Sequence, residues 1–196
     1  MVGSSSIARA ALVSKAAFAF AALGAHVELV DPGFADPRET FDVLWSTGAA
    51  RAIAGLPSAE GIDPGLAEIA GQGRSYSGVD YLAACGERDQ LAILMSRFHE
   101  DWDLLLTPAM PLAAFEAGRE VPEGREDPRW PGWTPFTYPF NLTQQPAATV
   151  PCGFTAAGLP AGLQIVGPRH ADALVLRAAR SYERAHPQPT VARLSP

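Results

Sequence analysis

Residues 139–167 read PFNLTQQPAATVPCGFTAAGLPAGLQIVG, and this stretch decides the fold. It contains two short apolar runs, Ala148–Cys152 and Leu163–Val166, with glycines and a proline between them. Short apolar runs that are bounded by glycine and proline are typical of buried β-strands. The stretch therefore predicts two core strands joined by a turn, a feature that many α/β proteins share.

Helical and strand-like patterns alternate over the rest of the chain and predict the α/β class. Ser77 and Asp80 form a capping box that opens a helix to about Glu100, and its apolar positions recur at helical spacing. A last helix, residues 171–185, is expected to be capped by Asp172. The other expected elements are helices over residues 7–24, 36–54 and 64–70 and strands over residues 26–30 and 103–106.

The wording of residues 139–167 resembles the C-terminal part of the amidase signature family, whose chains carry FN-x-T-x-x-P-A-x-x-V-P-x-G followed by G-L-P-x-G-L-Q-x-V-G. DLLLTPAMP (residues 103–111) and ALGAHVELVDPGF (residues 22–34) are similar to further segments of that family. The resemblance covers about Ile7 to Pro187 and implies an α/β fold with a mixed sheet flanked by helices. Residues 1–6 are then expected to be a disordered leader or a non-native remnant, and residues 188–196 a tail.

The family resemblance also implies where the chemistry lies. Amidase signature enzymes cut amide bonds with a serine nucleophile. A second serine takes the proton of this nucleophile and passes a proton on to a lysine. These residues belong to a GGSSGG-type region upstream of the part that this chain resembles, so no catalytic residue is expected here. Gly3–Ser6 lacks the flanking glycines, and Lys15, the only lysine, falls within an expected helix. Cys152 is either a thiol nucleophile or, the preferred reading, a buried small apolar residue.

A long loop rich in proline, glycine and tryptophan precedes the two core strands and includes RWPGWTPFTYPF (residues 129–140). Its aromatic side chains either pin the loop down or contact a substrate, and the resemblance implies that the region shapes the acyl side of a substrate pocket. The residues expected to bind substrate are Trp133, Phe136, Tyr138, Asn141, Thr143 and Gln144.

Gln144 stands where many family members have the glycine of a T-G-x-P motif. This departure predicts that the position does not require a positive φ. It also adds a polar side chain near the expected pocket, so we expect Gln144 or Gln145 to influence the choice of substrate.

Composition excludes several classes of function. The net charge is −6, from 21 acidic and 15 basic residues, and the sequence has no block of Lys or Arg, which disfavours nucleic-acid binding. His99-Glu100 begins like the zinc motif H-E-x-x-H, but residue 103 is Asp, so no metal or other cofactor is expected. No uncharged apolar run reaches the roughly 18 residues of a membrane span.

Two features of the sequence bear on the cellular compartment. Residues 16–25 (AAFAFAALGA), which follow Arg9 and Lys15, fit either the apolar part of a secretory signal peptide or a buried helix. Cys85 and Cys152 form no C-x-x-C motif or disulfide framework, which fits a reducing compartment. We favour the helix and a cytoplasmic protein.

Three functions remain open. The first is part of an enzyme that hydrolyses a small-molecule amide, to which this chain supplies core strands and pocket walls while the serine nucleophile lies in a missing N-terminal half. The second is a non-catalytic binding or scaffold protein with a residual amidase fold. The third is the A subunit of a tRNA-dependent amidotransferase. In the first case the exposed sheet edge and apolar helix faces predict that the chain pairs with that half or self-associates.

Overall fold

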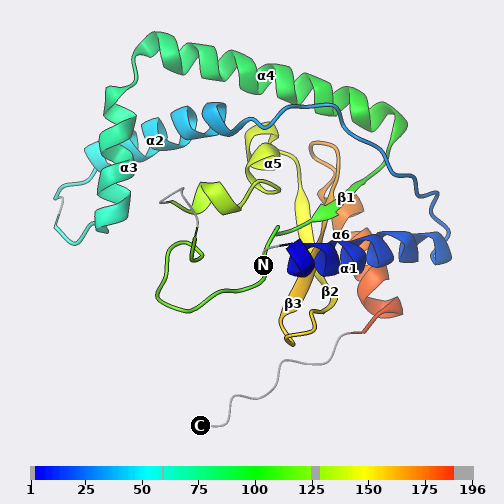
Figure 1. Cartoon of the computed structure of the whole chain (residues 1–196). Helices are drawn as coiled ribbons and strands as arrows, with labels where there is room; N and C mark the ends of the chain where they lie inside the picture. Colours follow the sequence, from blue (N-terminus) through cyan, green and yellow to red (C-terminus); the bar gives the residue numbers. More distant parts are fainter. Residues whose placement is uncertain (1–2, 59, 125–128, 188–196) are drawn as a thin grey trace.

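The structure is a computed structural model of the chain, and it describes residues 3–58, 60–124 and 129–187. Helices surround a small sheet (Figure 1). The helices are α1 (Gly3–Ala22), α2 (Arg38–Ala54), α3 (Pro64–Ser75), α4 (Gly78–Asp101), α5 (Tyr138–Thr143) and α6 (Asp172–Ala185), with a 3₁₀ turn η1 (Trp130–Trp133); the strands are β1 (Leu105–Pro108), β2 (Ala147–Phe154) and β3 (Pro160–Val166).

The two core strands predicted from residues 139–167 are β2 and β3, which form an antiparallel hairpin with Val150 opposite Leu163. β1 pairs with the other side of β3, so the strand order is β1-β3-β2. Both pairs are antiparallel, and no parallel pair of the expected mixed sheet occurs within the described residues. The α/β class is confirmed, with β1 and β2 as the sheet edges.

The sheet is covered on both faces because β3 alternates its side chains between two cores. Leu163 and Ile165 pack with α1 and α6, in a cluster that includes Phe20 and Tyr182. Val166 packs on the opposite face with α2, α4 and α5, in a cluster that includes Met95. Figure 1 shows α4 running above the sheet, with α1 and α6 beside the strands.

The predicted capping box of α4 is confirmed: the Ser77 hydroxyl accepts from the backbone N–H of Asp80, and the Asp80 carboxylate accepts from the backbone N–H of Ser77. The Ser77 hydroxyl also donates to the Asp80 carboxylate at 2.7 Å, and this bond together with that from the Ser77 backbone N–H lowers the pKa of Asp80. The expected cap of the last helix is wrong, since Asp172 is the first residue of α6 and no side chain caps that helix.

Two expectations for the N-terminal region differ from the structure. Helix α1 begins at Gly3, so residues 3–6 form its first turn; residues 1–2 and 188–196 of the expected leader and tail lie outside the described residues. The strand expected over His26–Val30 is wrong, because this segment has no strand assignment and Leu29 is 96 % exposed. A strand needs a neighbour to pair with, and no described strand pairs with this segment. No described helix combines the length and apolar character that crossing a membrane requires.

Candidate functional site

An open cavity of about 480 Å³ lies where β1 ends and β3 begins. β1 is followed by Ala109, whose backbone N–H donates to the carbonyl oxygen of Gly162 at 3.0 Å before the chain leaves the sheet as a loop. Only a glycine fits well at position 162, because a Cβ there would lie 3.2 Å from the Cβ of Ala109 and 2.8 Å from the Thr149 side chain. The lining residues are Val13, Ala109, Met110, Leu112, Ala113, Ala114, Phe115, Trp133, Thr149, Pro151, Pro160, Ala161 and Gly162.

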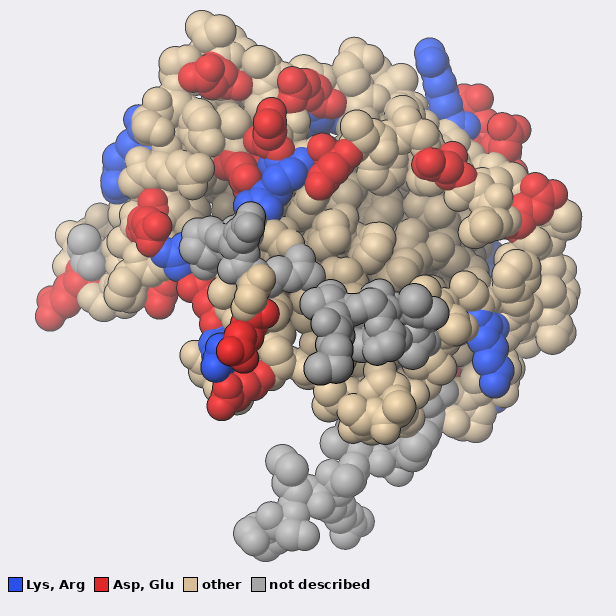
Figure 2. All heavy atoms as spheres, in the orientation of Figure 1, with Lys and Arg blue, Asp and Glu red and all other residues tan. Residues whose placement is uncertain are grey.

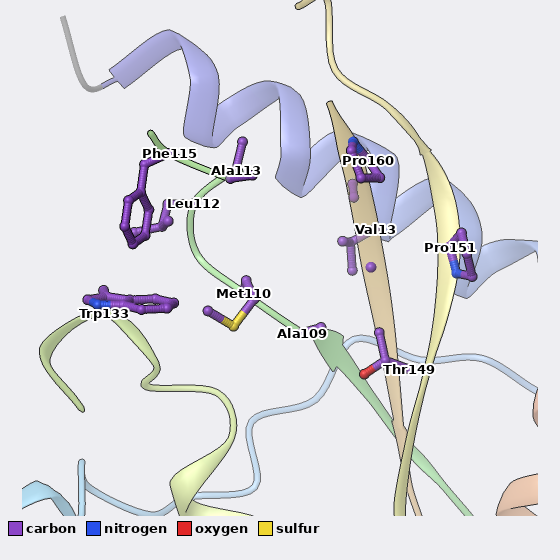
Figure 3. Close-up of a pocket in the computed structure, with 13 residues that line it drawn as sticks. Val13, Ala109, Met110, Leu112, Ala113, Phe115, Trp133, Thr149, Pro151 and Pro160 are labelled. Carbon is purple, nitrogen blue, oxygen red and sulfur yellow. The ribbon is translucent and has the colours of Figure 1, made fainter. Parts of the chain in front are cut away.

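We call this cavity the apolar pocket, because none of the described residues that line it has an ionisable side chain. Figure 3 shows Met110 between the Trp133 ring and the strands, with Val13 reaching toward the pocket from α1. Trp133 packs edge-to-face on Phe115, with ring centroids 5.2 Å apart, and its indole N–H donates to the carbonyl oxygen of Glu120 at 3.2 Å. The pocket therefore offers an aromatic and aliphatic wall suited to an uncharged apolar group.

A buried glutamine supports the loop that carries Trp133. Gln164 of β3 is 4 % exposed. Its side-chain N–H groups donate to the carbonyl oxygen of Phe136 at 2.7 Å and to the Thr107 hydroxyl at 3.0 Å. Because Phe136 lies three residues after Trp133, these bonds fix the loop relative to β1 and β3. The sequence analysis missed Gln164, although a polar residue within the apolar run LQIV is a detectable signal.

Of the six residues expected to bind substrate, Trp133 lines the apolar pocket and the other five do not. Tyr138 is 1 % exposed, and its hydroxyl donates to the Asp36 carboxylate at 2.5 Å. Burial and this carboxylate raise the pKa of Tyr138. Thr143 is also buried, whereas Asn141 and Gln144 are exposed at the end of α5. The structure thus brings these residues onto one segment but not into one cavity.

The expectation that Gln144 needs no positive φ is wrong. Gln144 ends α5 in the left-handed conformation, with φ 57° and ψ 35°. This conformation closes a helix by turning the chain, and a glycine adopts it without the penalty that a Cβ brings. The Gln144 side-chain oxygen accepts from the Arg169 guanidinium at 2.7 Å, which partly offsets that penalty.

A polar cluster that joins α4, α5 and β3 lies next to this turn. The Gln145 side chain contacts the Thr143 hydroxyl, the carbonyl oxygen of Gly167 and the imidazole of His99. Burial lowers the pKa of His99, an effect that a bond to the Trp102 carbonyl and the charge of Asp103 oppose. The sequence analysis weighed His99 only as half of a zinc motif, since local spacing does not reveal a contact between residues 46 positions apart.

The two side chains that the sequence offers as a possible base or nucleophile, Lys15 and Cys152, are unsuited to those roles. Lys15 is exposed on α1. Cys152 is 9 % exposed, and burial raises the pKa of its thiol, which disfavours the nucleophilic thiolate. Among the described residues, no group of His, Cys, Asp and Glu is arranged to hold a metal ion. Basic side chains are scattered over the face in Figure 2 rather than gathered into one patch.

A second cavity, of about 690 Å³, runs beside β1 between α1 and residues 24–30, and we call it the β1 groove. Its walls include Phe18 of α1, which is 55 % exposed, and Leu29. Leu104 and Leu106, at the unpaired edge of the sheet, form its floor. The groove thus combines exposed apolar side chains with ionisable ones, and it lies beside strand backbone that has no strand partner in the described part of the chain. The ionisable residues of its lining are His26, Glu28, Asp101, Asp103 and Arg177.

Comparisons with known proteins match this architecture. The sequence model of the Amidase family matches residues 10–176. An acylamidase of Rhodococcus erythropolis is 34% identical over 177 residues, which span 86% of this chain and 37% of the relative. The A subunit of a glutamyl-tRNA(Gln) amidotransferase from Myxococcus xanthus is 42% identical over 112 residues, 57% of this chain and 22% of the relative.

Solved structures give the same result. A 6-aminohexanoate cyclic dimer hydrolase superposes with a TM-score of 0.76 at 28% identity, covering 92% of this chain and 42% of that one. A bacterial aryl acylamidase of the amidase signature family superposes with a TM-score of 0.73 at 30% identity, covering 91% of this chain and 40% of that one. The chain therefore spans less than half the length of these relatives.

Proposed function

The chain belongs to the amidase signature family, and from this membership we propose that it is the pocket-forming part of an enzyme that hydrolyses amide bonds. It supplies core strands and one wall of the substrate site. The serine nucleophile and its activating serine and lysine belong to the portion of the relatives that this chain does not span. The substrate is a small amide, and the protein works in the cytoplasm, in line with its two unpaired cysteines.

The observation that supports this proposal is the apolar pocket. Its side chains come from the loop after β1, the β2–β3 hairpin, α1 and the Trp133 loop, and those of the described residues are all uncharged. Such a wall favours an acyl group that is neutral and apolar, because burying an unpaired charge there would cost on the order of several kcal/mol. We therefore propose anilides of aliphatic or aromatic acids as the substrate class.

The pocket can be tested without catalysis, by measuring the binding of acyl anilides to the purified chain by calorimetry. Affinity should rise about fourfold for each methylene added to the acyl chain, because a buried methylene contributes about 0.8 kcal/mol. A carboxylate-bearing acyl group of equal length should bind at least tenfold more weakly. Met110→Asp, which places a charge in the wall, should remove binding.

A matched control for this experiment is Leu176→Asp, because Leu176 is 64 % exposed on α6 and does not line the pocket. This variant should bind like the unchanged chain. Equal binding of Met110→Asp and Leu176→Asp would show that the apolar pocket is not the ligand site.

The β1 groove supports the second element of the proposal, a partner. Leu29 is 96 % exposed and Phe18 55 %, values that are unusual for large apolar residues beside an unpaired strand edge. We propose that the remainder of an amidase domain covers this surface in the active enzyme, and that the chain self-associates without it. Light scattering of the purified chain should show oligomers, and Leu29→Glu should reduce them; a monodisperse monomer over the micromolar range would argue against this element.

The A subunit of an amidotransferase is a second candidate, since several curated relatives carry that name and reach 42–44% identity. Those matches are shorter, however, and cover 43–57% of this chain. The uncharged described lining of the pocket is also ill-suited to the charged α-amino and α-carboxylate groups of free glutamine. Binding of free glutamine in preference to acyl anilides would favour this candidate.

A further inference from the structure

Gln145 lies where α5 ends and β2 begins, and its side-chain amide reaches three different elements. Its oxygen accepts from the Thr143 hydroxyl at 2.7 Å. Its nitrogen donates to the carbonyl oxygen of Gly167, just beyond β3, at 3.0 Å and lies 2.8 Å from Nε2 of His99 on α4. Both N–H groups of the amide and its oxygen therefore have partners.

These contacts fix the protonation state of His99. The Gly167 carbonyl can only accept, so the nitrogen of the Gln145 amide must face it and the neighbouring Nε2 of His99. Nδ1 of His99 lies 2.8 Å from the carbonyl oxygen of Trp102, which also can only accept. His99 must then carry its proton on Nδ1 and accept from Gln145 through Nε2, which is possible only for the neutral ring.

Protonation of His99 would place a second N–H against the N–H of Gln145. Rotating the amide would not relieve the conflict, because its oxygen would then face the carbonyl oxygen of Gly167. Gln145 would have to leave at least one of its partners, and the turn after α5 would lose its connection to α4.

The surroundings of His99 act on its protonation in opposite directions. Asp103, just before β1, favours the protonated ring, and Phe98 covers the ring edge-to-face with centroids 5.3 Å apart. On the segment after β3, Arg169 is bonded to Gln144. Burial outweighs the charge of Asp103 and lowers the pKa of His99.

We propose that His99 and Gln145 are positioning residues that hold residues 141–146 against α4 while His99 is neutral, and release them when it is protonated. This link goes beyond the proposed hydrolysis. The turn that it controls carries Asn141, Thr143 and Gln144, three residues predicted from the sequence to contact substrate.

The direction of the pH dependence follows from the lowered pKa. The unfolded chain protonates His99 near pH 6.5, about the ordinary value, whereas the folded chain resists protonation to a lower pH. The stability that the link contributes is therefore fully present above about pH 6.5 and is lost as the pH falls through the lower pKa of the folded state.

Nitrogen-15 NMR of the imidazole rings in the unchanged chain provides the first test. At pH 7.5 His99 should be neutral, with its proton on Nδ1 and none on Nε2. A proton on Nε2 at this pH would overturn the proposal without any variant being made.

Amide hydrogen exchange provides the second test, with each rate divided by its intrinsic value at the same pH. The backbone N–H groups of Gln145 and Gly167, which donate to Phe140 and Pro146, should lose protection roughly tenfold between pH 7.5 and the pH at which the same NMR spectra show His99 protonated. His99→Gln keeps an acceptor but does not titrate, so it should abolish this change. His26→Gln, at an exposed histidine, should retain it. An unaltered pH response in His99→Gln, or its loss in His26→Gln, would overturn the proposal.

Discussion

Replacing Gln164 by alanine tests how the wall of the apolar pocket is held in place. Gln164 is 4 % exposed and donates to the Phe136 carbonyl at 2.7 Å and the Thr107 hydroxyl at 3.0 Å. Gln164→Ala removes both donors and leaves a cavity between β3 and the loop that carries Trp133. We expect the variant to be less stable and to bind acyl anilides more weakly.

The magnitude follows from these two contacts. A buried carbonyl left without its donor costs about 1–3 kcal/mol, and the cavity adds about 1 kcal/mol. The free energy of unfolding should therefore fall by about 2–4 kcal/mol, a large part of the total for a domain of this size. With a urea slope of about 2 kcal/mol per molar, the unfolding midpoint should fall by about 1–2 M.

Urea unfolding followed by circular dichroism measures this change. Gln164→Glu is nearly isosteric but places an oxygen against the Phe136 carbonyl, so at pH 7 it should be at least as destabilised as the alanine variant. Gln72→Ala is the matched control, because Gln72 is exposed and its side chain donates to the Tyr76 hydroxyl over a long distance of 3.4 Å. Its midpoint should stay within the effect of about 0.5 kcal/mol that is typical of surface changes. A Gln164→Glu chain as stable as the unchanged one would refute the hydrogen-bonding argument.

Three further predictions concern other parts of the chain. Gly73→Ala should lower the free energy of unfolding by about 1–3 kcal/mol or more, because the new Cβ would collide with the backbone of Ser46 on α2. Gly71→Ala on the same helix meets nothing within 4 Å and should raise it by about 0.5–1 kcal/mol. Thermal melts that rank the two variants the other way would contradict the α2–α3 packing. Gln144→Gly should raise the melting temperature, because relief of the left-handed conformation is worth about 1–2 kcal/mol and exceeds the loss of an exposed bond; a lower melting temperature would mean that the bond to Arg169 dominates. Iodoacetamide should label Cys85 well before Cys152, which is buried and has a raised pKa, and the difference should vanish in denaturant; equal labelling of the folded chain would contradict the burial of Cys152.

The elements that the sequence predicts well are those whose signals are local. The β2–β3 hairpin follows from two apolar runs separated by turn residues, and the start of α4 follows from the Ser77–Asp80 capping box. Both depend on residues within a few positions of each other, where propensity and capping determine the backbone.

The elements that the sequence misses depend on distant partners. Residues 26–30 have the composition of a strand, but a strand forms only when it pairs with a neighbour, and no described strand pairs with them. Gln144 adopts a positive φ because the turn from α5 into β2 requires it, and the side chain does not reveal that need. The predicted substrate residues were placed by position along the loop, whereas the pocket gathers side chains from α1, β2, β3 and the loop after β1.

The contacts that hold the site were the hardest to foresee. Gln164 reaches Phe136 across 28 positions, and Gln145 reaches His99 across 46. The apolar run around Gln164 marks it as a buried polar residue, but the sequence does not reveal the distant partner of Gln164 or of Gln145, which appears only when the strands and helices are assembled.

Hydrolysis of acyl anilides by the purified, folded chain tests the central claim most directly. If the chain supplies the pocket wall and another portion of an amidase supplies the serine nucleophile, it should bind these amides without releasing aniline above the buffer rate. Turnover by the chain alone, abolished by Lys15→Ala or Cys152→Ala, would contradict this account and place a working catalytic group within these residues.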